Sequence, residues 1–112
     1  MKRVYVAGAY SADNVMDIFK NIRKGMRMST KVFLAGYAPF CPWLDYQYIL
    51  MLREGEFLSL EHFYEYGLAW LEVSDAVLVL PDSENSVGTQ EEIAEAALHN
   101  IPVYYKIEDL KK

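Results

Sequence analysis

Two adjacent glutamates, Glu91 and Glu92, carry carboxylates that could act as a nucleophile or as a general acid or base in a cleft. They follow the polar loop PDSENSVG, which comes after the apolar run AVLVL, a run typical of a strand buried on both faces. In the helix expected after the loop, Ile93, Ala96 and Ala97 share the face that packs on the sheet. Glu91 points away from this face and Glu92 lies beside it, so Glu92 is the better candidate for chemistry.

The start of this helix bears on the charge of Glu92. Ser86 or Thr89 can cap the helix, which places both glutamates in its first turn, where the helix dipole favours negative charge. Glu92 is then expected to stay ionised, as a nucleophile must. The alternative is an ordinary first-turn glutamate with no chemical role.

Two loops of small and polar residues could hold a ligand. The loop GAYSAD lets a ligand approach the backbone, and the second loop offers amides at the start of a helix, a favoured seat for phosphate. Ser86 could serve as a phosphate ligand, as a helix cap, or as both. The candidate substrate-binding residues of the two loops are Gly8, Ala9, Tyr10, Ser11, Ser86, Gly88 and Thr89.

The remaining elements follow from apolar runs and from the residues that stop them. The first helix, capped by Asp13 or Ser11, is expected to reach about Ala35 and to stop at Gly36, although KVFLA could instead be a strand. A helix capped by Ser59 should direct four residues into the core: Leu60, Phe63, Leu68 and Leu71. Strands are expected at 3–8, 37–41, 76–80 and 103–105, with further helices at 43–55, 59–73 and between the last two strands.

This alternation predicts a single α/β domain over residues 1–112, with a Rossmann- or flavodoxin-like parallel sheet of strand order 2-1-3-4 flanked by helices. The first and third strands are then neighbours whose following helices lie on opposite faces. Ligands bind such sheets at the carboxyl ends of these strands. The expected crevice is lined by residues 9–13 and 81–92.

Composition excludes several classes of function. A net charge of −5 argues against binding a nucleic-acid polymer, and no apolar run approaches the length of a membrane span. The single cysteine, Cys41, excludes an internal disulfide and is typical of the reducing cytoplasm. His62 and His99 have no partner at ligand spacing, so neither a metal ion nor another cofactor is expected.

Three segments, VYVAGAYS, LAWLEVSDAVLVLPDS and SVGTQEEIAEAALHNIPVYY, resemble the nucleoside 2-deoxyribosyltransferase superfamily, and within it a small branch described as a domain of unknown function. The resemblance spans nearly the whole chain. It implies that Glu92 attacks the anomeric carbon of a sugar, that Tyr5 orients it, and that Asp75 handles the base. Without the resemblance, Tyr5 is a core residue and Asp75 caps a turn.

One departure narrows the expected substrate. Nucleoside-preferring transferases place an acidic residue six positions before the nucleophile, where this chain has Ser86, as do relatives that hydrolyse nucleoside 5′-monophosphates. The resemblance therefore implies an N-glycosidase rather than a base-swapping transferase. The run from Gly88 to Glu92 is also similar to the GTxxE ending of phosphoribohydrolases that release cytokinin bases, without the Gly-Gly that precedes it there.

The resemblance also implies a homodimer or larger oligomer in which a neighbouring subunit completes the pocket, with the aromatic segment 43–70 as interface material. Asp45, Tyr46 and Gln47 are similar to a base-side element of the transferases, and their alternative is a solvated helix face. Two other hypotheses stay open for the whole chain. One is a catalytically silent nucleotide-binding sensor or regulatory module, and the other is a purely structural oligomer.

Overall fold

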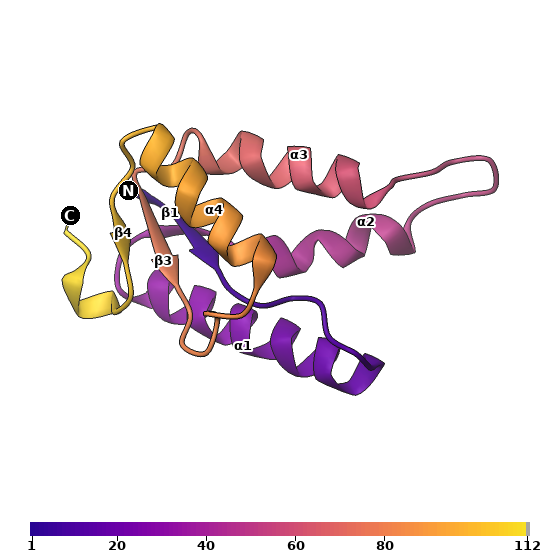
Figure 1. Cartoon of the computed structure of the whole chain (residues 1–112), viewed down its shortest axis with the longest axis horizontal. Helices are drawn as coiled ribbons and strands as arrows, with labels where there is room; N and C mark the ends of the chain where they lie inside the picture. Colours follow the sequence, from indigo (N-terminus) through magenta and orange to yellow (C-terminus); the bar gives the residue numbers. More distant parts are fainter. Residues whose placement is uncertain (112) are drawn as a thin grey trace.

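The computed structural model describes residues 1–111. Strands and helices alternate as the sequence predicts (Figure 1), and the order is β1 (Arg3–Ala7), α1 (Val15–Leu34), β2 (Ala38–Phe40), the 3₁₀ turn η1 (Pro42–Asp45), α2 (Tyr46–Leu50), α3 (Leu60–Leu71), β3 (Ala76–Val79), α4 (Val87–Leu98), β4 (Val103–Tyr104) and the 3₁₀ turn η2 (Ile107–Asp109). The predicted strand order is confirmed: the parallel sheet runs β2-β1-β3-β4. Tyr5, in the middle of β1, lies opposite Phe40 of β2 and Val77 of β3.

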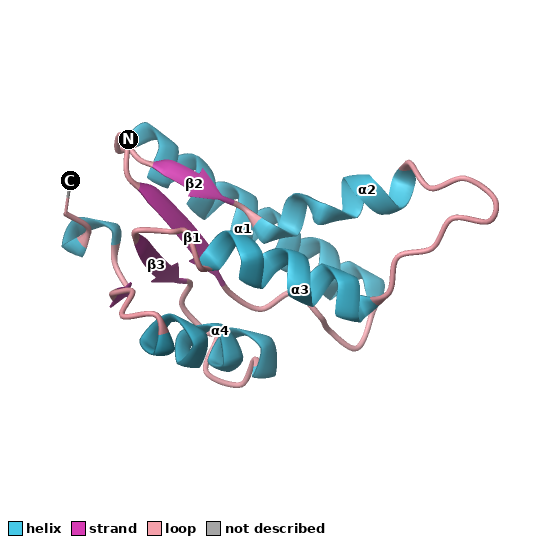
Figure 2. Cartoon of the chain, turned by 90° about the horizontal axis from the view of Figure 1, so that it is seen from above, coloured by secondary structure: helices cyan, strands magenta, loops and turns pink. Residues whose placement is uncertain are grey.

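Successive residues of β1 face opposite sides of the sheet because side chains alternate along a strand. Val4 and Val6 pack with Ile22 of α1 in one core cluster. Tyr5 and Ala7 pack in the other, which includes side chains of α3 and α4. The sheet is therefore covered by α1 on one face and by α3 and α4 on the other (Figures 1 and 2).

α1 is one continuous helix, so the strand interpretation of KVFLA is wrong. It begins after Asn14, whose side chain accepts a hydrogen bond from the backbone N–H of Asp17, and not after Asp13 or Ser11. Asn14 also has the extended backbone that an N-cap residue needs. Gly36, with φ of 96°, follows the helix as predicted.

Trp43 anchors the α1 face of the sheet. It is 1% exposed, and its indole N–H donates to the Ala9 carbonyl at 3.0 Å. Its ring lies where a side chain on Gly25 would be, since a Cβ built there would come within 2.0 Å of the ring. Trp43 is therefore core and not interface material, because a deep aromatic ring gains more from burial than from exposure.

The segment after Trp43 departs from the predicted single helix over 43–55. η1 is followed directly by α2, which ends at Leu50. Residues 51–59 then form a loop that projects from the body of the molecule in both views (Figures 1 and 2). Ser59 caps α3 as predicted, in a capping box with His62. Leu71 is buried, but Leu60 is 89% exposed, because the first turn of α3 extends beyond the sheet.

The end of the described chain contributes to the core. The sequence predicts only a polar tail of about one turn after β4. That turn is present as η2, and Leu110 after it is buried against the α1-side cluster. Among the described residues, no helix is long and apolar enough to cross a membrane.

Candidate active site

Ser86 determines where α4 begins. Its hydroxyl oxygen accepts hydrogen bonds from the backbone N–H of Thr89 at 3.2 Å and from the Thr89 hydroxyl at 2.8 Å. The helix therefore starts at Val87, and its first turn contains no acidic residue. Glu91 and Glu92 lie in the second turn, so the predicted support of their charge by the helix dipole is weaker than expected, since that effect fades beyond the first turn.

Tyr5 and Glu92 are brought into direct contact across the interior. The Tyr5 hydroxyl, from the centre of β1, donates a hydrogen bond to Glu92 Oε2 on α4. Tyr5 is 2% exposed, and Glu92 is half-buried while Glu91 faces solvent. Gly67 of α3 makes room for this contact, because a Cβ there would lie 3.2 Å from the Tyr5 hydroxyl. The predicted orientations of Glu91 and Glu92 are confirmed, but Ala97, expected on the face that packs on the sheet, is exposed.

The charge state of this pair differs from the expectation. Burial, with a smaller effect of the neighbouring Glu91, raises the pKa of Glu92 to about 7, although the hydrogen bond from Tyr5 opposes the rise. Burial and the neighbouring Glu92 also raise the pKa of Tyr5, so its phenol stays neutral and remains a donor. Glu92 is therefore divided between carboxylate and carboxylic acid near neutral pH. A group in that range can serve as a nucleophile or in proton transfer.

Asp75 lies in a different setting from this pair. It immediately precedes β3 at the amino edge of the parallel sheet, whereas the candidate loops follow the carboxyl ends of β1 and β3. Its Oδ2 accepts a hydrogen bond from the backbone N–H of Arg3 at 2.8 Å, and its own N–H donates to the Arg3 carbonyl at 2.8 Å. This contact matches the turn-capping alternative for Asp75.

The loop after β1 is held by contacts within the protein. The Ala9 carbonyl accepts from Trp43, and the Tyr10 carbonyl accepts from the Asn21 side chain at 3.1 Å. The Tyr10 hydroxyl donates to Asp45 Oδ1 at 2.8 Å. Gly8 is closely packed, since a Cβ there would lie 3.1 Å from both Leu80 and Trp43, whereas Ser11 is exposed.

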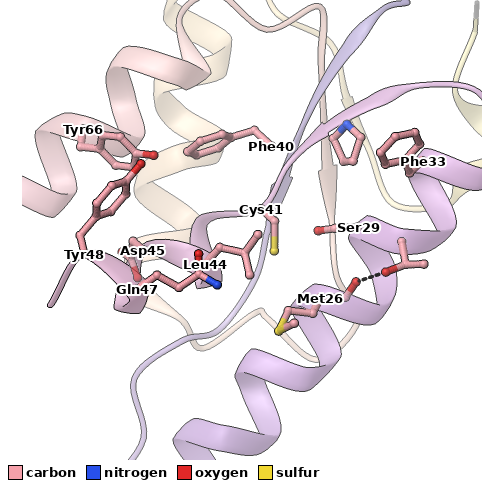
Figure 3. Close-up of a pocket in the computed structure, with 12 residues that line it drawn as sticks. Met26, Ser29, Phe33, Phe40, Cys41, Leu44, Asp45, Gln47, Tyr48 and Tyr66 are labelled. Atoms are coloured by element: carbon pink, nitrogen blue, oxygen red, sulfur yellow. Dashed lines mark hydrogen bonds between the residues drawn. The ribbon is translucent and has the colours of Figure 1, made fainter. Parts of the chain in front are cut away.

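A cavity of about 480 Å³ lies beside β2 (Figure 3). It is not the crevice predicted from the sequence, because none of residues 9–13 or 81–92 lines it. The projecting α2 and α3 extend the site past the edge strand, an arrangement that strand order alone does not reveal. The lining residues come from α1, β2, the residue that joins β2 to η1, η1, α2 and α3: Met26, Ser29, Thr30, Phe33, Pro39, Phe40, Cys41, Leu44, Asp45, Gln47, Tyr48 and Tyr66.

Phe40 connects this cavity to the Tyr5–Glu92 pair. Its ring lines the cavity and stacks on Tyr5, with ring centroids 5.4 Å apart. Tyr66 lies 5.8 Å from Phe40 and also 5.8 Å from Tyr48. The cavity thus has an aromatic wall that starts at Phe40, and Phe40 contacts Tyr5, the hydrogen-bond partner of Glu92.

Asp45 and Gln47 line the cavity, and Tyr46 packs against the α1-side core instead. The solvated-face alternative does not describe the half-buried Asp45, but it does describe Gln47, which is exposed. Burial raises the pKa of Asp45, and this outweighs the opposing hydrogen bonds from Tyr10 and from the backbone of Tyr46. The sequence pattern indicates a role for Asp45 and Gln47 but gives no sign of the contact between Tyr10 and Asp45. Tyr10 lies in the loop after β1 and Asp45 lies in η1, 35 positions away, and this separation carries no spacing signal for a contact.

Glu72, Glu95 and His99 form a group of possible metal ligands among the described residues, with ligand atoms within 4.8 Å of one another. His99 Nε2 lies 3.1 Å from Glu95 and 3.8 Å from Glu72. The expectation that His99 has no partner at ligand spacing is therefore wrong, because Glu95 stands one helical turn before it. The three groups are partly exposed and make an ion-pair network between α3 and α4.

Comparison with known proteins places the chain in a family. The family model described as "Domain of unknown function (DUF7768)" matches residues 2–106. No curated protein sequence shows a significant match. Among solved structures, a 2-deoxyribosyltransferase from Bacillus psychrosaccharolyticus is similar, with a TM-score of 0.58 and 20% sequence identity over 90% of this chain and 69% of that one. This likeness shows a shared fold.

Proposed function

The chain belongs to the DUF7768 family, and we propose that it cleaves or transfers the N-glycosidic bond of a nucleoside or nucleoside 5′-monophosphate, with hydrolysis favoured. The observation that carries the proposal is the contact between the Tyr5 hydroxyl and the half-buried Glu92, whose carboxyl has a pKa of about 7. The fold shared with a 2-deoxyribosyltransferase supports the same class of bond. Structural stability alone does not favour burying such a pair, because burial of a carboxylate is costly.

In the proposed reaction, the Glu92 carboxylate attacks the anomeric carbon of the sugar while the bond from that carbon to the base nitrogen breaks. The base leaves with the electron pair of that bond and takes up a proton. The sugar carbon passes through a state with oxocarbenium character, which a nearby carboxylate stabilises. Tyr5 orients the attacking carboxylate through its hydrogen bond. Water, or a second base, then displaces Glu92 from the sugar.

A phosphate on the sugar would sit at the start of α4. The Ser86 oxygen accepts hydrogen bonds from Thr89. Within residues 1–111, the Ser86 hydroxyl donates no side-chain hydrogen bond, so it is able to donate to a phosphate. The backbone amides near Gly88 are available at a helix N-terminus, where anions bind well. The segment from Gly8 to Ser11 would form the facing side. This arrangement supports a 5′-monophosphate over an unphosphorylated nucleoside.

We also propose that the protein works as a homo-oligomer. α2, the loop after it and the start of α3 expose several large apolar side chains: Ile49, Leu50, Met51, Phe57, Leu60 and Tyr64. Exposed apolar surface of this extent is typical of an interaction site. Sedimentation of the wild type and of a Phe57→Ser, Leu60→Ser double variant tests this proposal. We expect the variant to dissociate, and a monomeric wild type would contradict the proposal.

The function is tested by detecting free base after incubation with nucleosides and 5′-monophosphates, with and without an added acceptor base. We expect release by the wild type, loss of at least about a thousandfold in Glu92→Gln, and little change in the matched variant Glu91→Gln. A new nucleoside in the presence of acceptor would indicate a transferase. If the wild type binds nucleotides but releases no base from any of them, the enzyme proposal is wrong and a nucleotide sensor becomes the better explanation.

A further inference from the structure

We infer that Asp45 is the acid that protonates the departing base, and that the cavity beside β2 seats this base. The inference rests on the proposed function and replaces Asp75 in the base-side role. It is carried by the position of Asp45 on the cavity wall, its hydrogen bond with Tyr10, and the connection of that wall to Tyr5.

The hydrogen bond with Tyr10 holds the Asp45 side chain in place. The Tyr10 hydroxyl donates to Oδ1 at 2.8 Å, which leaves Oδ2 as the oxygen that would carry the proton when Asp45 acts as an acid. Asp45 is half-buried at the start of α2 and is one of the residues that line the cavity (Figure 3). A carboxyl group held in this way can transfer a proton without a large rearrangement.

The cavity has the shape and chemistry to accept a flat heterocycle. Its volume of about 480 Å³ falls within the range of small-molecule sites. Tyr48 and Tyr66 contribute aromatic rings to the wall beside Phe40, and Gln47 offers an amide that can donate to or accept from the edge of a base. Aromatic stacking is a general means of binding nucleobases.

Asp45 also lies within electrostatic reach of the nucleophile's partner. Its charge raises the pKa of Tyr5, whose hydroxyl is bonded to Glu92, and Phe40 lies between the Tyr5 ring and the cavity. A sugar over Glu92 with its base against Phe40 would bring the glycosidic nitrogen towards Asp45. Four titratable groups that influence or surround Asp45 have raised pKa values and are neutral near pH 7: Tyr5, Tyr10, Cys41 and Tyr66.

The step balances as follows. A bond forms between Glu92 oxygen and the anomeric carbon, and the bond from that carbon to the base nitrogen breaks. The nitrogen keeps the electron pair, and the base receives the proton from Asp45 Oδ2, leaving Asp45 as a carboxylate. In the second step the carboxylate accepts a proton from the attacking water, whose oxygen bonds to the sugar as Glu92 departs. Asp45 and Glu92 then return to their starting states.

The test compares two guanine nucleotides, one of them methylated at N7. The methylated base carries a positive charge and leaves as a neutral molecule, so it needs no proton from the enzyme. We expect Asp45→Asn to release unmodified guanine about a hundredfold or more slowly than the wild type and to release N7-methylguanine at nearly the wild-type rate. Glu92→Gln should lose both activities, and Tyr10→Phe should lose a smaller part of the guanine activity alone.

Release of the methylated base by Asp45→Asn also shows that the variant is folded. Equal partial losses on both nucleotides would overturn the inference, as would an Asp45→Asn variant with full activity on guanine. If Asp45→Asn has no activity on either nucleotide, Asp45→Glu distinguishes loss of the acid from loss of the fold. Release of guanine by Asp45→Glu supports the acid role of Asp45, and absence of release overturns it. A wild type that releases neither base would instead show that the proposed function is wrong.

Discussion

The two faces of the sheet are made from the same strands but bury different chemistry. On the α1 face, Val4 and Val6 pack with apolar side chains around Trp43. On the face covered by α3 and α4, Tyr5 places a hydroxyl group against Glu92. The first face gains stability from apolar burial, whereas the second contains a carboxyl group whose charged form is destabilised by burial. Because side chains alternate along β1, the strand contributes apolar packing to one face of the sheet and the Tyr5 hydroxyl of the candidate site to the other.

The largest expected effect tests the α1 face. Gly25→Ala would place a Cβ within 2.0 Å of the Trp43 ring, and neither the helix nor the buried ring can move freely. We expect a loss of about 3 kcal/mol or more in the free energy of unfolding, measured by urea denaturation. This is opposite in sign to the usual effect of alanine in a helix.

Gly88→Ala is the matched control for this substitution. Gly88 also lies in a helix, and a Cβ there meets no atom within 4 Å. We expect it to be neutral or to stabilise the protein by about 0.5 kcal/mol. Equal effects of the two substitutions would show that Trp43 does not constrain Gly25.

The second effect concerns Glu92 and pH. Its pKa rises from 4.5 to about 7 on folding, so the folded state favours the protonated form. The associated stability is complete below the unfolded pKa and is lost as pH rises through the folded pKa. We expect Glu92 to account for a loss of about 2 kcal/mol in the free energy of unfolding between about pH 5 and pH 8, measured by denaturation at each pH.

Glu92→Gln should remove this part of the pH dependence, because its amide does not titrate. Glu91→Gln, at an exposed position, should largely keep it. Parallel pH profiles for the wild type and Glu92→Gln would contradict the raised pKa. If the reaction needs ionised Glu92, its rate should increase as the pH rises through about 7.

The smallest effect separates the two interpretations of Asp75. Asp75→Ala removes the acceptor for the Arg3 N–H, and we expect a loss of about 1 kcal/mol in stability with kcat unchanged for the folded protein. Asp75→Asn keeps an acceptor and should lose less stability. A large fall in kcat in a folded Asp75→Asn variant would instead return the base-side role to Asp75.

Much of the fold could be predicted because it depends on local patterns. Apolar runs and their stops located the strands, and the alternation of elements led to the confirmed order β2-β1-β3-β4. The orientation of Glu92 followed from the angular spacing of residues on a helix. Its charge state was predicted wrongly, because burial against Tyr5 involves a residue 87 positions away and has no local pattern.

Other errors arose in the same way. Leu60 has helical spacing with the core residues of α3 but lies in a turn that extends past the sheet, where no apolar partner covers it. Trp43 was placed at an interface because its burial depends on space left by Gly25 in another helix. The cavity beside β2 requires α1, α2 and α3 together, and the strand order predicted a crevice elsewhere.

The sequence by itself determined the parallel sheet, the helix that carries Glu92, and the side of that helix on which the carboxyl group lies, because these depend on periodicity over neighbouring residues. Only the tertiary structure decided which groups meet: Tyr5 with Glu92, Tyr10 with Asp45, and Asp75 with Arg3. These contacts depend on the packing of distant segments and on the water that packing excludes. For that reason the pKa of Glu92 and the position of the cavity were properties of the folded chain alone.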